Sequence, residues 1–309
     1  MRSRVDPGPP TPQASVVVAH AARPARWLDY IELAKPRMNF LVIVTTVIGY
    51  WMAASQPLHL GHLLQTLLAT AMLAASASVL NQYAERAHDA KMDRTAGRPL
   101  PAGRVLPAEA LAIGSTLAVA GFAWLLAATN ALAALLGLFT LASYILIYTP
   151  LKRVTSLCTV VGALPGAIPP VIGWAAAAGR ITPEAVALFG ILFLWQMPHF
   201  LAIGILWRED YAKAGFVMLP VVDRSLGLVG RQIVLYSLWL VPASLAPAAM
   251  GMVHGLYVGG ALLLGIGLAA CAVACARNRR RADARRLFIA SILYLPLLLG
   301  LLVIDKVRL

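Results

Sequence analysis

Long apolar stretches follow one another through most of this chain and leave few folds open to it. A helix needs about 20 predominantly apolar residues, roughly 17–25, to cross the hydrocarbon core of a bilayer. Because 60% of the 309 residues are hydrophobic and only 13% are charged, the composition excludes a soluble domain. The sequence predicts an all-α fold, a polytopic membrane bundle of nine transmembrane helices within one domain over residues 26–309. The predicted spans are residues 38–55, 62–82, 107–128, 131–149, 156–178, 184–204, 231–250, 255–276 and 287–304.

The N-terminal segment before the first span differs in composition from the rest of the chain. Residues 1–25 are rich in Pro, Ala, Val and Arg and contain no long apolar core. We therefore expect a disordered cytoplasmic tail rather than a signal peptide. Residues 27–37 mix aromatic, acidic and basic side chains, which predicts a segment lying at the membrane interface.

The basic residues indicate the orientation of the bundle. If the chain alternates through nine spans, 23 of its 26 Lys and Arg residues fall on one side, and only Arg180, Lys306 and Arg308 fall on the other. Basic residues concentrate on the cytoplasmic side of membrane proteins. We expect an integral protein of the bacterial inner membrane with a cytoplasmic N-terminus, an external C-terminus and a cytoplasmic active site. An eight-span arrangement with an internal C-terminus remains an alternative. The net charge of +13 follows this topology, so no nucleic acid is expected as a partner.

A polar run at the end of the second predicted span carries the strongest chemical signal. Asn81, Glu85 and Asp89 are four residues apart, and each such step rotates a helical side chain by only about 40°. Their oxygens therefore share one face, and Mg²⁺ prefers carboxylate and carbonyl oxygens. Arg94 and Arg98 add planar guanidinium groups, which suit phosphate oxygens. The pattern predicts a Mg²⁺–diphosphate site at the membrane boundary.

This run also permits a simpler interpretation, a charged helix end exposed to water. We favour the functional one because ionisable groups at this depth are usually functional. Asp93 continues the four-residue series but has rotated by about 120° from Asn81, which makes it a weaker ligand candidate. Arg98 precedes Pro99, so the helix is expected to end there and a loop to follow.

Three residues close the fourth predicted span on the same side. Tyr148, Lys152 and Arg153 are typical of interfacial anchors, whose long basic side chains reach the membrane surface. Beside an anionic site, Lys152 and Arg153 also become candidates for neutralising a departing diphosphate.

The fifth predicted span contains prolines and small residues in the segment GALPGAIPPVIGW, residues 162–174. Tandem prolines kink a helix, and membranes tolerate the freed carbonyls only where protein or a cavity surrounds them. The segment therefore predicts either close helix packing through small residues or a cavity wall shaped by the kink.

The sixth predicted span contains polar groups that suggest a second part of the site. Gln196 and His199 are three residues apart, which places them on one helical face, and Trp195 adjoins them. An imidazole can bind haem iron, pair with a carboxylate or move a proton, although a hydrogen-bonded core histidine is the simpler alternative. Glu209 and Asp210 could assist a second Mg²⁺ or lie in a solvated loop.

These segments resemble the UbiA superfamily of intramembrane prenyltransferases. NQYAERAHDAKMDRTAGRPLPAG is the most specific of them, and it is joined by YTPLKR with GALPGAIPPVIGW and by WQMPHF with REDYAKAGFVMLP. The resemblance implies a nine-helix fold, with Mg²⁺–diphosphate bound through Asn81, Glu85 and Asp89. It also implies basic site residues, which are Arg94, Arg98, Lys152 and Arg153.

WQMPHF and DYAKAG resemble the branch of the superfamily that prenylates haem. This branch implies transfer of a farnesyl group from farnesyl diphosphate to a vinyl group of haem B, with addition of water to give haem O. It implies Mg²⁺ as cofactor, haem B and farnesyl diphosphate as substrates, membrane lipids as surroundings and haem A synthase as a downstream partner. Residues expected to bind substrate are Tyr148, Trp195, Gln196, His199 and Asp210, besides Arg94 and Arg98. The chain departs from the aromatic branch, which has a second aspartate-rich motif where His199, Glu209 and Asp210 stand here.

Three other functions remain open at this point. The chain could prenylate a quinone precursor or a chlorophyll-like ring, which a prenylated phenol in lipid extracts would reveal. It could be a cation-coupled transporter with a broken fifth helix, although no internal repeat supports this. It could also be a non-catalytic haem scaffold, whose haem binding would not depend on Glu85 or Asp89.

Overall fold

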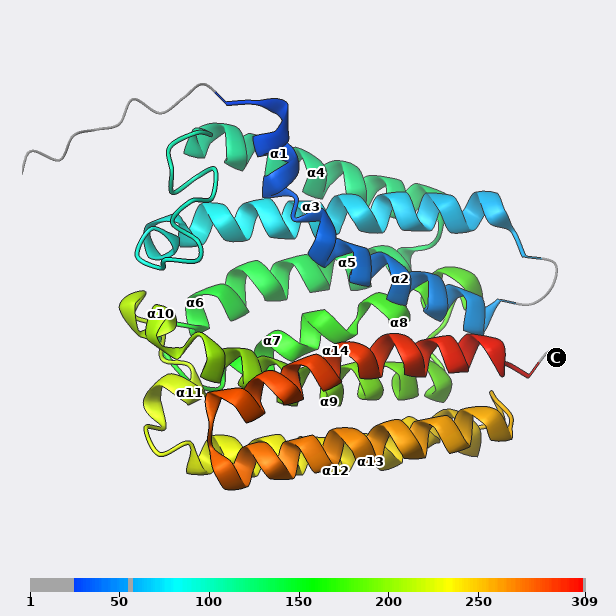
Figure 1. Ribbon diagram of the computed structural model, residues 1–309. Coiled ribbons are helices and arrows are strands. Elements are labelled where there is room, and N and C mark those ends of the chain that lie inside the picture. The colour runs from blue at the N-terminus through cyan, green and yellow to red at the C-terminus, as the bar shows by residue number, and fades with distance from the viewer. Residues whose placement is uncertain (1–24, 55–57, 308–309) are drawn as a thin grey trace, which may run out of the picture.

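The computed structural model describes residues 25–54 and 58–307, and this part of the chain is helical apart from turns and one isolated bridge between Val253 and Lys306. Ten helical segments build the bundle: α2 (Pro36–Ala53), α3 (Leu60–Asp89), α4 (Pro107–Ala128), α5 (Ala131–Ala142), η1 (Ser143–Tyr148), α7 (Cys158–Ala167), α8 (Pro169–Ala178), α9 (Pro183–Leu206), α12 (Gly227–Ala249) and α13 (Gly255–Asn278). They are completed by α14 (Arg281–Ile304) and by four short helices, α1 (Trp27–Leu33), α6 (Thr149–Leu151), α10 (Arg208–Lys213) and α11 (Leu219–Val222). The long helices lie side by side, as Figure 1 shows.

Eight membrane-length apolar segments are present in the described residues, where the sequence predicted nine spans. The difference concerns α2. This helix has 18 residues, and its first turn contains Arg37 and Asn39, which reduce its apolar character. It nevertheless lies within the bundle among the other long helices (Figure 1), so the all-α membrane bundle is confirmed, although α2 is not among the membrane-length apolar segments.

The helix limits follow the predicted spans closely, with two corrections. The predicted connection over residues 277–286 is much shorter, because α13 continues to Asn278 and α14 begins at Arg281. The helix α3 was expected to reach Arg98 but ends at Asp89. The Met92 amide, at 3.2 Å, and the Thr95 hydroxyl, at 2.8 Å, both donate to the Asp89 carbonyl oxygen and end the helix there. The predicted tail of residues 1–25 lies almost wholly outside the described residues.

Several helix starts follow from local sequence. Pro36, Pro107 and Pro183 occupy the first turns of α2, α4 and α9, where a residue without an amide hydrogen is best tolerated. Glu109 and Glu184 lie in the first turns of α4 and α9, where a negative charge complements the helix dipole.

Small residues allow the closest helix contacts. The prolines divide the fifth span into α7 and α8, and α8 packs against α2. A Cβ atom on Gly49 would collide with the Pro170 backbone, and one on Gly173 would collide with the Thr46 carbonyl oxygen. The prediction that this segment packs closely against another helix through small residues is therefore confirmed.

The outer face of the bundle is apolar. Side chains such as Val119 of α4 and Leu263 of α13 are at least 70% exposed although they lie within long helices. Such exposure is expected where lipid rather than water surrounds the protein, so the chain is an integral membrane protein.

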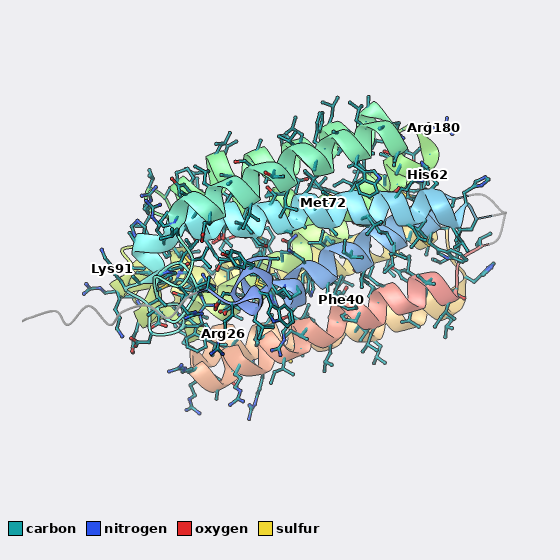
Figure 2. All side chains as sticks on the ribbon, turned by 90° about the horizontal axis from the view of Figure 1, so that it is seen from above. Arg26, Phe40, His62, Met72, Lys91 and Arg180 are labelled. Carbon is teal, nitrogen blue, oxygen red and sulfur yellow. The ribbon has the colours of Figure 1, made fainter. Side chains whose placement is uncertain are left out.

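The polar connections gather at one end of the bundle. The end of α3, the turns over residues 90–105, α6 and α10 lie together at the left of Figure 1. Figure 2 places Lys91 at this end and Arg180 at the opposite end. The arrangement agrees with the charge asymmetry of the sequence. We refer to the end bearing Lys91 as the charged end.

Candidate active site at the charged end

The C-terminal end of α3 buries the three polar side chains that the sequence predicted to share one face. Asn81, Glu85 and Asp89 are 3%, 6% and 1% exposed. Their burial excludes the solvated helix end that the sequence also permitted. Carboxylates buried to this extent require charged or hydrogen-bonding partners, and each of the two has a cation beside it.

Glu85 pairs with a lysine from another helix. The Lys152 ammonium, which follows α6, lies 2.8 Å from Glu85 Oε1 and donates a hydrogen bond of 3.0 Å to Oε2. It also lies 4.5 Å from the centre of the Tyr148 ring. A buried pair of this kind costs much desolvation, so its presence is weak evidence for stability and favours a functional role.

Asp89 pairs with Arg98 at 2.7 Å. The pair forms because the chain turns back after Asp89 rather than continuing as helix. Arg104, from the same turns, binds Asp29 of α1 at 2.8 Å and the Gly97 carbonyl oxygen at 3.0 Å. The early end of α3 is therefore what brings Arg98 to the carboxylate.

Asn81 is hydrogen-bonded to Thr149, the residue that follows a π-helical turn. Its amide donates to Thr149 Oγ1 at 3.2 Å, and the Thr149 hydroxyl donates to the Tyr144 carbonyl oxygen at 2.8 Å. The turn η1 lies directly before Thr149, and π-helical insertions are frequent at functional sites. Together η1 and α6 bring Tyr148, Thr149 and Lys152 to the end of α3.

Arg153 has a different environment from Lys152. Its guanidinium lies 3.4 Å from His88 Nε2, while His88 Nδ1 lies 2.9 Å from the Ala214 carbonyl oxygen. A guanidinium and a carbonyl fit only one neutral tautomer, in which Nδ1 donates and Nε2 accepts. His88 therefore links Arg153 to the turn after α10, and sequence reasoning missed this role.

Arg94 and Asp210 belong to a second cluster at the charged end. The Arg94 guanidinium lies 5.6 Å from the Trp207 ring and 5.9 Å from the Tyr211 ring, and its backbone amide donates to Asp210 at 3.4 Å. Arg94 therefore stacks on aromatic rings, whereas Arg98 pairs with Asp89. Asp93 lies outside α3, is 81% exposed, and pairs with Lys213 at 2.6 Å. Its position in a turn removes it from the face that Asn81 occupies.

Gln196 and His199 have hydrogen-bond partners on different helices. The Gln196 amide donates to the Ala163 carbonyl oxygen of α7 at 3.3 Å, and its side chain packs against Gly166. His199 instead contacts α14, where Nδ1 lies 2.8 Å from Ser291 Oγ. Three residues separate them by about 60° around the helix, so they lie on the same side of α9, yet each meets a different neighbouring helix.

The environment of His199 selects its tautomer. The Ser291 hydroxyl donates to the Phe288 carbonyl oxygen at 2.7 Å, so its oxygen accepts from His199 Nδ1. Nε2 then carries a lone pair. The imidazole stacks on the Trp195 ring at 4.9 Å, and Trp195 itself donates to the Ser291 carbonyl oxygen at 2.7 Å. An anchored Nδ1 with an available Nε2 is the usual arrangement of a metal-binding histidine.

Sequence reasoning also missed Lys35. It was counted only as a topological charge, yet its ammonium interacts electrostatically with Arg98, Lys152, Asp89 and Glu85. Burial, followed by repulsion from Arg98 and Lys152, lowers the pKa of Lys35 to about 7. The only sequence signal was a lysine directly before the proline that begins a span.

Comparison with known proteins identifies the group to which this arrangement belongs. The model of the UbiA prenyltransferase family matches residues 42–295. A protein of Solibacter usitatus named protoheme IX farnesyltransferase is 50% identical over 287 residues, covering 90% of this chain and 98% of the relative. A protein of Myxococcus xanthus with the same name is 43% identical over 282 residues, covering 90% and 95%.

Solved structures show the same fold. Digeranylgeranylglyceryl phosphate synthase superposes with a TM-score of 0.76 at 17% identity, covering 91% of this chain and 99% of the other. A UbiA homologue from Archaeoglobus fulgidus bound to DMAPP and Mg²⁺ superposes with a TM-score of 0.65 at 16% identity, covering 89% and 99%. Since the family model spans most of the sequence and the relatives align along nearly all of it, this chain belongs to the UbiA prenyltransferase family.

Proposed function

We propose that this chain transfers the farnesyl group of farnesyl diphosphate to a vinyl group of haem B, with addition of water, to give haem O. The proposal rests on the similarity to a protein named protoheme IX farnesyltransferase. This chain is 50% identical to that protein over an alignment that covers 98% of the relative's length. Family membership favours prenyl transfer over the cation transport and the non-catalytic scaffold that the sequence left open.

The buried oxygens of α3 fit a Mg²⁺–diphosphate ligand. Mg²⁺ is commonly bound by one or two carboxylates together with substrate phosphates and water. Such a set is offered by Asn81, Glu85 and Asp89. Glu85 Oε1 is buried and accepts no hydrogen bond. Its contact with the Lys152 ammonium, at 2.8 Å, is an ion pair only. Within the described residues no group of three His, Cys, Asp or Glu side chains could hold a metal alone. The site therefore depends on the amide of Asn81 and on the phosphates of the substrate.

Bound Mg²⁺ would neutralise the diphosphate and favour its departure. The chain's own cations would share this role, with Lys152 and Arg98 nearest the carboxylates, and Arg153 and Arg94 farther out. As the C1–O bond of farnesyl diphosphate breaks, both electrons leave with the diphosphate oxygen. Preorganised positive groups stabilise that developing charge without reorganising. The Tyr148 ring beside Lys152 offers a π-face to the allylic cation that remains.

The acceptor then supplies the electrons for the new bond. The π pair of a haem vinyl group attacks C1 of the farnesyl cation, which leaves a cation on the vinyl carbon beside the porphyrin ring. Water adds to this carbon and loses one proton, which gives the hydroxyethylfarnesyl group. The diphosphate leaves as the second product, so atoms and charge balance.

We assign the porphyrin contact to the surface around His199. Its Nε2 lone pair suits the haem iron, and the partly buried Phe288 beside it offers an aromatic ring to a flat porphyrin. Trp195 is buried and supports the imidazole by stacking on it. Gln196, whose amide donates a hydrogen bond to α7, is assigned to the same substrate pocket. Asp210 and Arg94 are assigned to its rim at the charged end.

The charge asymmetry supports a cytoplasmic active site in a bacterial inner membrane. The product would pass to haem A synthase, which acts on the same porphyrin. Both assignments are parts of the proposal.

Product analysis tests the acceptor directly. Purified protein in nanodiscs would receive haem B, farnesyl diphosphate and Mg²⁺, beside a panel of phenolic acceptors, and the products would be measured by mass spectrometry. We expect haem to gain the mass of one farnesyl group plus one water, and EDTA to abolish the gain. Unchanged haem together with a prenylated phenol would refute the haem assignment.

A further inference from the structure

A groove runs along the outer side of the neighbouring helices α12 and α13. Its volume is about 790 Å³, within the range of about 300–1,000 Å³ that is typical of ligand sites. The residues that line it include Leu238 and Pro242 of α12 and Ile266, Ala270, Val273 and Arg277 of α13. The two helices lie at the lower edge of the bundle in Figure 1, whereas α3 lies in its upper part. The groove is therefore separate from the candidate active site.

The side chains of the groove suit a hydrocarbon chain. Leu238 and Ile266 are 54% and 64% exposed, so these walls face the lipid rather than another helix. Ala270 contributes only a methyl group, which leaves room along α13. Apart from Arg277 the lining is apolar, so an acyl chain gains dispersion contacts there and leaves no polar side chain without a partner.

Two arginines lie at the charged end of the groove. Gly230 of α12 packs against Ala276 of α13, which sets the register of the two helices at this end. Arg231 and Arg277 each follow one residue of that contact, so they lie within about 3 Å of each other along the helix axes. Arg231 precedes Leu238 by seven residues, which is close to two full turns. Both therefore share the face of α12 that borders the groove.

Neither arginine has an anionic partner. Arg231 and Arg277 are exposed, and no hydrogen bond or ion pair joins either side chain to a described residue. The carboxylates of the same end are bonded elsewhere. Asp283 pairs with Arg286 at 3.1 Å, and Asp223 accepts two backbone amides at the start of α12. Unpaired basic side chains at a membrane surface attract anionic lipid headgroups.

The length of the groove matches one leaflet of a bilayer. From Arg277 to Ile266 the helix α13 rises by about 16 Å, at about 1.5 Å per residue. The hydrocarbon core of a bilayer is about 30 Å thick, so one leaflet contributes about 15 Å. A lipid with its headgroup at Arg277 would therefore extend its chain along the groove to the middle of the membrane.

From this groove and its two unpaired arginines we infer a binding site for a membrane phospholipid with an anionic headgroup. Arg231 and Arg277 hold the headgroup phosphate, and the groove beside Ala270 takes an acyl chain. The site goes beyond the proposed prenyl transfer, because it uses no residue of the candidate active site. A ligand that binds only the folded state raises its stability, so the bound lipid stabilises the bundle.

Native mass spectrometry of the purified full-length protein in detergent tests the site. The protein would be titrated with phosphatidylglycerol, which is anionic, and with phosphatidylcholine of the same acyl chains, which is zwitterionic. The double variant Arg231→Gln, Arg277→Gln removes both charges at the groove. Arg281→Gln, Arg285→Gln is the matched control, since it removes two exposed charges from α14 at the same end. Ala270→Phe fills the groove and leaves every charge unchanged.

We expect the wild type to bind phosphatidylglycerol more tightly than phosphatidylcholine, and its Tm to rise when phosphatidylglycerol is added. The double variant at the groove should lose about 30-fold in affinity for phosphatidylglycerol, the effect of two basic residues at an anionic membrane surface. Ala270→Phe should weaken the binding of both lipids, because it occupies the space of the acyl chain. The control variant should bind like the wild type. Because all the substituted side chains are exposed, each variant should keep the wild-type Tm without added lipid.

Four outcomes would overturn the inference. Equal affinity for the two lipids would show that the headgroup charge plays no role. An equal loss of affinity in the control variant would show that general charge attraction suffices. Displacement of phosphatidylglycerol by farnesyl diphosphate would assign the groove to the substrate instead. A dimer that Ala270→Phe dissociates would assign it to a second copy of the chain.

Discussion

At the scale of single residues, the ion pair between Glu85 and Lys152 allows a structural role to be distinguished from a catalytic role by substitution. Replacing Lys152 by Met leaves the buried Glu85 carboxylate without its cation. Loss of one partner of a buried pair costs about 3–5 kcal/mol, so we expect a clearly lower Tm and loss of turnover. Thermal unfolding and prenylation assays would measure the two effects on the same preparation.

The double variant Glu85→Gln, Lys152→Met distinguishes the two contributions. It removes both charges, so stability should largely return while activity should not. A double variant that recovers wild-type turnover would show that the pair serves only the fold.

The His199 imidazole gives a second prediction at this scale. His199→Ala removes the Nε2 lone pair, so the KM for haem should rise by at least about tenfold, or about 1.4 kcal/mol. The KM for farnesyl diphosphate should stay constant, as steady-state kinetics with each substrate varied in turn would reveal. Ser291→Ala keeps the imidazole but frees Nδ1, and should have a smaller effect of the same kind. An unchanged KM for haem in His199→Ala would argue against the porphyrin contact.

Residues that share one helix were predictable, and residues that converge from several elements were not. The spacing of Asn81, Glu85 and Asp89 is local, and their shared burial follows from it. Lys35 reaches the site only through a left-handed turn, and no single-sequence pattern encodes its long-range neighbours. The spacing of Gln196 and His199 did not reveal that they hydrogen-bond to different helices, because that depends on how α7 and α14 pack against α9.

At the scale of helices, α2 and α8 depend on glycine for their contact. Gly49→Ala would place a Cβ atom against the Pro170 backbone, which cannot move as a side chain can. Overpacking commonly costs about 1–3 kcal/mol, and a backbone contact belongs at the upper end of that range. We expect a lower Tm or loss of folded protein in size-exclusion chromatography.

Gly190 provides the control for this substitution. It lies within α9, and a Cβ atom there would meet no atom within 4 Å. Gly190→Ala should keep or slightly raise the Tm, since alanine favours helix. Equal stability of the two variants would contradict the packing account.

Hydropathy predicted the helix limits well because apolar length is a local property. The expectation drawn from Pro99 misplaced the end of α3, because that end depends on Thr95 and Met92 binding the Asp89 carbonyl oxygen. The π-helical turn at residues 143–148 was also unpredictable, because it lies within a continuous apolar pattern. The amide and the hydroxyl of Thr149, which follows it, both donate to the Tyr144 carbonyl oxygen.

At the scale of the whole molecule, the two ends of the bundle should lie on opposite sides of the membrane. In a background with the native cysteines replaced, Arg180→Cys should react with an impermeant maleimide in intact spheroplasts. Lys91→Cys should react only after permeabilisation, because basic connections face the cytoplasm. Labelling of both sites in intact spheroplasts would contradict the orientation.

The most direct measurement follows turnover in the intact protein in a bilayer when one buried carboxylate loses its charge. Asp89→Asn keeps the shape of the side chain, and Asp93→Asn makes the same change at an exposed position outside α3. With haem B, farnesyl diphosphate and Mg²⁺, we expect Asp89→Asn to lower kcat by at least about 100-fold, the scale of losing one electrostatic contact in a transition state. It should keep the Tm within a few degrees, and Asp93→Asn should match the wild type. Wild-type turnover in a folded Asp89→Asn variant would contradict the assignment of catalysis to the end of α3.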